Sequence, residues 1–191
     1  LEVLKKMEKL FVTLGLDQAP NGGLYLTRMQ ERMAPLEHDQ IMAQVLDASG
    51  KVIFPASFYF DVAKELDEHT LELLHKNALQ LADTAEDSSA PLANVVDLPI
   101  PLYMESAAGI GHAMILKDQD GKTRREQLLY QYKDALYPSY ALALAAKAAG
   151  ISPSEIAVRL GSDINFGPYT LPISRDSSVR IRFKGGLDSF E

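Results

Sequence analysis

The sequence predicts an α/β or α+β fold, in which helices cover a mixed β-sheet and the last third of the chain is rich in strands. Two periodicities support this class. Helical and strand-like patterns interleave over the first two thirds of the chain, and several short β-capable runs separated by turns follow Gly150. At 191 residues, with 47% hydrophobic and 24% charged residues, the composition is that of an ordinary globular protein. We therefore expect a single domain over residues 1–191.

The first half of the chain is expected to be mainly helical. Leucine and phenylalanine recur at helical spacing up to Leu14, where Gly15 is a stop signal, and Asp67 is placed to cap a later helix. The expected elements are a helix over 1–14, a turn over 21–23, a helix over 39–48, a buried strand over 51–55 that 58–60 continue or reopen after Pro55, a helix from 67 to about 81 and a loop over 84–91.

The second half is expected to contain a hairpin, an apolar helix and a set of short strands. Asp120-Gly121 is among the strongest short hairpin signals, and prolines at 99 and 101 are suited to start a helix. The expected elements are a helix over 102–108, a hairpin of strands 110–117 and 123–133, a helix over 139–149 packed on most sides, and strands over 156–160, 164–166, 169–173 and 179–183.

Composition excludes several classes of function. The formal net charge is −7, and no segment gathers lysine and arginine into a stripe, so nucleic acid is not an expected partner. The chain has no cysteine, which excludes disulfides, thiolate nucleophiles and cysteine-based metal sites. The most apolar stretch, 140–151, is broken by Lys147 and is shorter than the roughly 20 residues of a membrane span. Because the chain begins with Leu1 and has no leader, we expect it to be a piece of a longer protein.

The motifs point to no catalytic site, cofactor or metal. The serines lack the G-x-S-x-G and S-x-x-K contexts of activated nucleophiles, and no glycine-rich phosphate loop is present. Asp118-x-Asp120-Gly121 resembles the start of a calcium loop, but Lys122 stands where a third oxygen ligand would be needed. A plain hairpin turn is the preferred interpretation, and calcium binding is the alternative.

His112 is the histidine that the sequence singles out. It alternates with Ile110 and Met114 on one face of the expected strand, so we expect it to be at least half buried and to have a hydrogen-bond partner. A core histidine is favoured over a ligand contact. If the domain responds to pH, the same residue is a candidate proton sensor.

Arg124 and Arg125 are expected to point to opposite faces of one strand, because side chains alternate there. Only one of them can face the core, and that guanidinium needs a carboxylate or a ligand anion to offset desolvation. An internal partner such as Glu105, Glu126 or an aspartate is favoured over a ligand.

Several segments together form a pattern typical of one protein family. They are Ala107-Ala-Gly-Ile-Gly-His112, Asp118-Gln-Asp-Gly121 followed by Arg124-Arg125, Leu136-Tyr-Pro-Ser-Tyr-Ala-Leu-Ala, Leu171-Pro-Ile and Val179-Arg-Ile-Arg-Phe-Lys-Gly185. These segments resemble the CHASE family, type 2. Upstream, Leu36-Glu-His-Asp39 and Val52-Ile-Phe-Pro55 are also similar. The resemblance covers roughly residues 36 to 190. The strand and Trp-Pro-x-Pro-Arg segment that usually open the family pattern have no counterpart, and Thr123 occupies a usually apolar position.

The resemblance implies a non-enzymatic sensor on the extracytoplasmic face of a bacterial membrane. Such domains lie between transmembrane helices, outside this chain, and control nucleotide cyclases, histidine or Ser/Thr kinases, or cyclic-di-nucleotide enzymes. The expected partner is an unknown small molecule or protein signal, and a homodimer is possible. His112, Asp120, Arg124 and Arg125 are the candidate ligand-binding residues. The alternatives are a solute-binding or protein-interaction module and, third, a small hydrolase.

Overall fold

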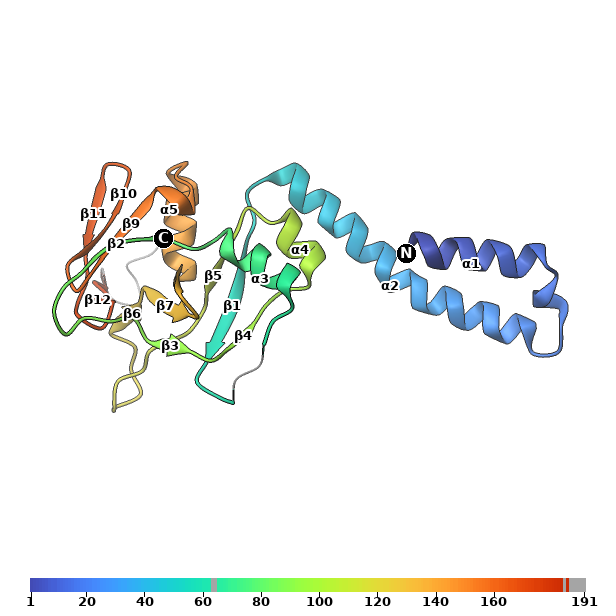
Figure 1. The fold of residues 1–191 in the computed structure, drawn as a ribbon, viewed down its shortest axis with the longest axis horizontal. Helices are drawn as coiled ribbons and strands as arrows, with labels where there is room; N and C mark the ends of the chain where they lie inside the picture. The colour runs from blue at the N-terminus through green and yellow to red at the C-terminus, as the bar shows by residue number, and fades with distance from the viewer. Residues whose placement is uncertain (63–64, 184, 186–191) are drawn as a thin grey trace.

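The computed structural model describes residues 1–62, 65–183 and 185. A helical hairpin projects from a mixed α/β body (Figure 1). Helix α1 (Glu2–Thr13) runs away from the body, the 3-10 turn η1 (Leu16–Gln18) lies at the tip, and helix α2 (Gly22–Ser49) returns to the body. Side-chain contacts hold α1 on α2, because Lys5 forms an ion pair with Glu37 at 2.7 Å and Gln30 donates to Glu8 at 2.8 Å.

The long helix α2 corrects the sequence prediction, which gave a helix over 39–48 preceded by a turn at 21–23. Asn21 has φ +66° and provides the turn, and the helix begins at Gly22. A Cβ on Gly22 would lie 1.9 Å from the Leu16 carbonyl oxygen, so only glycine fits where the helix starts. Much of the early part of α2 is exposed, so no buried face imposes a clear hydrophobic period there.

One face of the α1 region is apolar and exposed. Val3, Met7, Leu10 and Leu14 are 69%, 53%, 57% and 61% exposed. Their spacing of four, three and four residues is the spacing of a coiled-coil seam. We call these four residues the outer seam, because they lie on a different face from Leu4 and Phe11, which are partly buried.

In the described part of the chain, the strands of the body form four small sheets, whose strand orders are as follows. The first sheet is β4 (Val95–Asp97), β1 (Ile53–Tyr59) and β5 (Gly109–His112). The second is β11 (Tyr169–Pro172), β10 (Asp163–Phe166), β9 (Ile156–Leu160) and β2 (Gln80–Thr84). The others are β3 (Leu92–Ala93), β7 (Leu129–Tyr132) and β8 (Ala135–Pro138), and the pair β12 (Ser178–Arg180) and β6 (Arg125–Gln127).

Parallel and antiparallel pairs occur in the same sheet, so the predicted mixed α/β class is confirmed. β1 runs parallel to β5 and antiparallel to β4, while β2 runs parallel to β9, which is antiparallel to β10. The helices of the body are α3 (Glu68–His75), α4 (Pro101–Ser106) and α5 (Tyr140–Ala148), with a 3-10 turn η2 (Pro153–Glu155). Of the two alternatives for the strand at Pro55, continuation is the one found, since β1 runs through Pro55 to Tyr59. Proline is tolerated there because β4 begins to pair only at Ser57.

Two hydrophobic clusters make up the core, and the β7–β8 hairpin belongs to both. Leu129 and Leu136 pack with the β9–β10 side, where Val158 and Ile164 are fully buried. Tyr130 and Tyr137 pack with the β1–β5 side, around Phe58. Alternation of side chains along a strand explains why one hairpin supplies both clusters.

The C-terminal half of α2 is anchored to the first sheet through α4. Tyr103 donates its hydroxyl to Asp39 at 2.6 Å and stacks on Phe54 of β1 with ring centroids 5.8 Å apart. Ala43 and Leu46 of α2 are buried. The last turns of α2 therefore belong to the body, whereas the earlier turns belong to the projecting hairpin (Figure 1).

The helix predicted from Asp67 is correct at its start and wrong at its end. Asp67 caps α3 by accepting from the Thr70 backbone N–H at 3.0 Å. The helix ends at His75, because the Asn77 side chain donates to the Leu73 and Leu74 carbonyls and turns the chain. Residues 80–84, expected to lie at the helix end or in the following loop, form β2 against β9, which shows tertiary pairing overriding helical periodicity.

The predicted hairpin of 110–117 with 123–133 is wrong as a strand pair. β5 pairs with β1, and β6 pairs with β12, so the two runs share no ladder. The turn between them is nevertheless formed, since Gly121 donates to Asp118 and Asp118 to the Lys122 carbonyl. Gly121 has φ +77°, as an Asp-Gly turn requires.

The apolar helix over 139–149 is confirmed as α5, with Ser139 as its cap. The expectation that it packs on most sides is wrong. Leu142 and Ala146 are buried, but Leu144 is 41% exposed. The four strands predicted after Gly150 are present as β9, β10, β11 and β12, but the last was predicted over 179–183 and β12 ends at Arg180.

We expect Gly121→Val to lower the free energy of unfolding by about 1–2 kcal/mol, because a β-branched residue is strained at positive φ. A Cβ at this site would meet no atom within 4 Å, so the expected cost comes from the backbone conformation rather than from a clash of the Cβ. Gly121→Asn is the matched control, since asparagine tolerates this conformation. Thermal and urea denaturation measure both variants, and equal stability of the two would contradict the assigned turn.

Candidate functional site

The four residues that the sequence selected do not form one site. His112 lies on β5 in the core, Asp120 and Arg124 lie on the exposed 118–124 turn, and Arg125 lies on β6. They occupy three separate environments, of which Asp120 and Arg124 share one.

Arg124 is held by carboxylates of its own turn. Its guanidinium contacts Asp118 at 2.7 Å and Asp120 at 2.8 Å, and all three side chains are at least one-third exposed. The pKa of Asp120 is lowered, first by the hydrogen bond from Arg124. This pairing accounts for the two aspartates that resemble a calcium loop. Within the described part of the chain, no three His, Cys, Asp or Glu residues gather as a metal site.

Arg125 also has an internal partner, as predicted. It donates to Ser174 at 2.8 Å and to Asp176 at 3.4 Å, on the loop that precedes β12. The same loop accepts from Gln127, whose side-chain amide reaches the Asp176 carbonyl at 2.7 Å. Arg125 and Gln127 therefore fasten β6 to the β12 loop.

His112 is buried, with 1% of its surface exposed, but the expected hydrogen-bond partner is not found among the described residues. Its ring lies edge-on to Tyr130 with centroids 4.6 Å apart and near Phe58 at 5.9 Å. Burial lowers the pKa of His112 to about 4, because desolvation disfavours the charged imidazolium. His112 is a neutral core residue at neutral pH.

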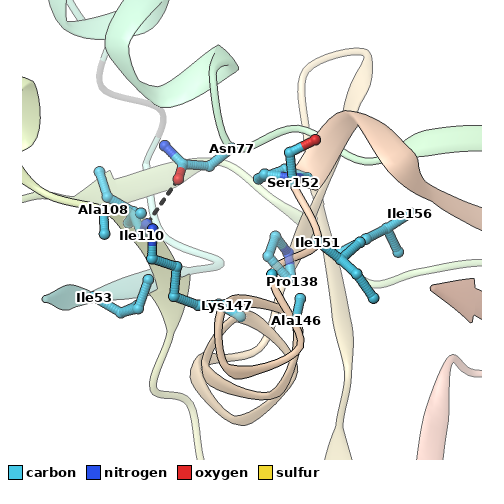
Figure 2. A pocket seen from close by; sticks show the side chains of 14 residues that line it. Ile53, Asn77, Ala108, Ile110, Pro138, Ala146, Lys147, Ile151, Ser152 and Ile156 are labelled. Atoms are coloured by element: carbon cyan, nitrogen blue, oxygen red, sulfur yellow. Dashed lines mark hydrogen bonds between the residues drawn. The ribbon is translucent and has the colours of Figure 1, made fainter. Parts of the chain in front are cut away.

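A cavity of about 220 Å³ lies elsewhere, between α5 and the first sheet. Its lining consists of Ile53, Asn77, Ala108, Gly109, Ile110, Pro138, Ala143, Ala146, Lys147, Gly150, Ile151, Ser152, Pro153 and Ile156. Figure 2 shows Ile53, Ala108 and Ile110 on one side and Ala146, Ile151 and Ile156 on the other. Ile110 belongs to one core cluster, and Ala146 and Ile156 belong to the other, so the cavity lies where the clusters meet.

Small residues and one amide keep this space open. A Cβ on Gly109 would approach the Ile53 Cδ1 atom at 2.9 Å and the Asn77 Oδ1 atom at 3.4 Å. Asn77 Oδ1 accepts from the Ile110 N–H at 2.7 Å, which ties β5 to the end of α3 (Figure 2). Ala143 and Ala146 present only methyl groups from α5.

The charge at the cavity comes from a lysine. Among the residues that the structure describes, Lys147 is the one charged member of the lining, and no aspartate or glutamate belongs to it. A neighbouring depression on the outer side of α5 is lined by Lys147 together with Lys51, Ser49 and Gly50. Neither lysine makes an ion pair within the residues that the structure describes.

Sequence reasoning missed this cavity. One signal was present, since Lys147 interrupts a helix that otherwise contains almost only alanine and leucine. Asn77 gave no signal, because its role depends on β5, which is 33 residues away.

Comparison with protein-family models shows which family this chain belongs to. A family model described as the CHASE2 domain matches residues 5–191. The chain belongs to the CHASE2 domain family. The match begins at residue 5, so it includes most of α1 and the first half of α2, which the sequence resemblance did not reach. Comparisons with curated proteins and with solved structures found no match.

CHASE2 domains are extracellular sensory domains, and this membership supports a sensory rather than a catalytic role. No helix in residues 1–62, 65–183 and 185 has the length and apolar character of a membrane span. The geometry also gives the hydrolase alternative no support. His112 pairs through its backbone with Ser139, but the Ser139 hydroxyl accepts from Leu142 as a helix cap, and neither residue lines the cavity.

We expect His112 to make the domain less stable as pH falls. Its folded pKa of about 4 lies below the ordinary 6.5, so between these values the unfolded chain binds a proton that the folded chain does not. The effect is absent above about pH 7 and reaches about 2 kcal/mol at pH 5. Urea unfolding at pH 7 and pH 5 should show that His112→Leu reduces this loss.

His38→Leu, at an exposed position in α2, is the control for loss of a histidine. It should leave the difference between pH 7 and pH 5 close to that of the wild type. An equal acid loss in wild type and His112→Leu would contradict the buried, neutral state of His112.

Proposed function

We propose that this CHASE2 domain is the extracytoplasmic sensory input domain of a transmembrane receptor, and that a small molecule bound in the α5 cavity is its signal. Family membership supports the sensory role. The observation that carries the choice of site is the position of the cavity at the meeting of the two core clusters. An occupant would contact both clusters at once.

The cavity is also close to the point where the projecting helix enters the body. Ile53 lines the cavity and opens β1, three residues after Gly50, which ends α2. A ligand that favours one packing of α5 against β1 and β5 shifts the population of that packing. Such a shift reaches α2 through Ile53 and through Phe54, whose ring stacks on Tyr103 beside α2. This gives a route from ligand to helix.

In the full receptor, membrane helices outside this chain would carry the change to a cytoplasmic output. The outputs that we propose are an adenylate cyclase, a histidine or Ser/Thr kinase, or a diguanylate cyclase. The alternative is a solute-binding or protein-interaction module of a membrane complex, and it is distinguished by the absence of any output domain in the full-length gene.

A thermal-shift screen of the wild type and of a variant with a filled cavity tests whether the ligand binds in the α5 cavity. Small metabolites, anions, divalent metals and pH steps are screened, because a ligand that binds only the folded state raises its melting temperature. We expect Ala143→Leu, which places a larger side chain in the cavity lining, to abolish a shift seen in the wild type. Ala141→Leu, at an exposed position of the same helix, should retain it.

A shift that survives in Ala143→Leu would place the ligand elsewhere. The absence of any shift across the screen would count against a small-molecule signal and favour the protein-interaction alternative.

We further propose that the receptor is a homodimer and that the outer seam of α1 pairs with the same seam of a second copy. The heptad spacing of Val3, Met7, Leu10 and Leu14 is suited to packing against a second helix rather than against a flat surface. In a parallel two-fold pair each residue meets its own equivalent, so every layer would be apolar.

Cysteine cross-linking measures this contact directly, because the natural chain contains no cysteine. We expect Met7→Cys to form a disulfide dimer under mild oxidation. Val12→Cys is the control, since Val12 is 47% exposed but lies on the opposite side of α1. Equal cross-linking of both variants, or none at Met7→Cys, would contradict this interface.

A further inference from the structure

We infer that the α5 cavity takes a small organic anion, with an apolar body inside the cavity and an anionic group at Lys147. This inference rests on the function proposed above and adds the chemical class of the ligand. It follows from the size of the cavity, its polarity and the charges around it.

The volume of the cavity limits the size of the ligand's apolar part. A cavity of about 150 Å³ lined by apolar side chains holds a benzene molecule. The α5 cavity has about 220 Å³, which leaves room for one ring, or a chain of about six carbons, together with a small polar group.

The lining favours an apolar body over a sugar or a peptide. Alanine, isoleucine and proline side chains make up most of it. Asn77 is the amide that faces the space, and both ends of that amide are already used. Its oxygen accepts from Ile110, and its nitrogen donates to the Leu73 and Leu74 carbonyls. A ligand with many hydroxyl groups would therefore leave them unpaired.

The charged side chains around the cavity favour an anionic ligand. The protein has a formal net charge of −7, yet Lys147 lines the cavity and Lys51 joins it in the adjoining depression. Among the described residues, no carboxylate belongs to either lining, and the Glu155 carboxylate, which accepts from Ser152 of the cavity lining, is occupied by that capping contact. Near the C-terminal end of α5, the carbonyls of Ala145, Ala146 and Lys147 accept from the backbone N–H groups of Ala149, Ile151 and Gly150, so these three carbonyls already have a donor other than the ammonium group. Figure 2 shows the Lys147 side chain extending from α5 toward the side of the cavity that carries Ala108 and Ile110. An ammonium at the mouth of an apolar cavity suits a carboxylate.

Isothermal titration of the whole chain with benzoate and hexanoate tests the inference, with benzamide as the neutral analogue and sulfate as the inorganic anion. We expect benzoate or hexanoate to bind wild type, and Lys147→Met to weaken binding about tenfold, the scale of one charge-assisted hydrogen bond. Lys147→Arg should retain binding because it keeps the charge. Lys117→Met, which removes an exposed lysine elsewhere, should have no effect.

Three results would overturn the inference. Equal binding of benzamide and benzoate would show an apolar site without anion selection. Binding of sulfate as strong as that of benzoate, unaffected by Ala143→Leu, would show a surface anion site only. Failure of both carboxylates to bind would exclude this ligand class. The proposed sensory site would still stand in the first and third cases if the broader screen gave a neutral ligand whose shift Ala143→Leu abolishes.

Discussion

The β7–β8 hairpin is the constraint on which the body depends, because one short element completes two cores. Its leucines, Leu129 and Leu136, face the β9–β10 cluster, and its tyrosines, Tyr130 and Tyr137, face the β1–β5 cluster. Strand alternation makes the two sets inseparable, so neither cluster can shift along the hairpin without moving the other. Backbone bonds reinforce this, since Leu79 donates to the Leu136 carbonyl and Ser139 donates to that of Leu128.

The cavity is a consequence of this arrangement. Two clusters that share a hairpin pack tightly along it, but away from it the contact between α5 and the first sheet is made by small residues, among them Gly109, Ala143 and Ala146. The space that remains is bordered by both clusters, and the buried amide of Asn77 keeps β5 in place beside it. A molecule bound at such a boundary would shift the population toward the packing that it binds more tightly.

The sequence predicted local structure better than pairing. Caps and turns were found correctly at Asp67, Ser139 and Gly121, because their signals depend on neighbouring residues. The strand partners of β5 and β6 were not found, because β1 and β12 lie more than 50 residues away along the chain. The extent of α2 was also missed, since an exposed helix has no buried face to impose a hydrophobic period.

The residues of the candidate site were likewise not predicted, because their role depends on contacts between distant parts of the chain. The residues that looked reactive are the ones whose charges the fold satisfies locally, as with Arg124 between Asp118 and Asp120. His112 was recognised as buried, yet burial makes it a neutral core residue and separates it from the cavity. Lys147 and Asn77 carry no motif, and only the packing of α5 against β5 gives them a shared surface. In a sensory domain, where no reaction demands a fixed set of catalytic groups, a binding site is defined by the space that the packing leaves, and residue types alone cannot reveal it.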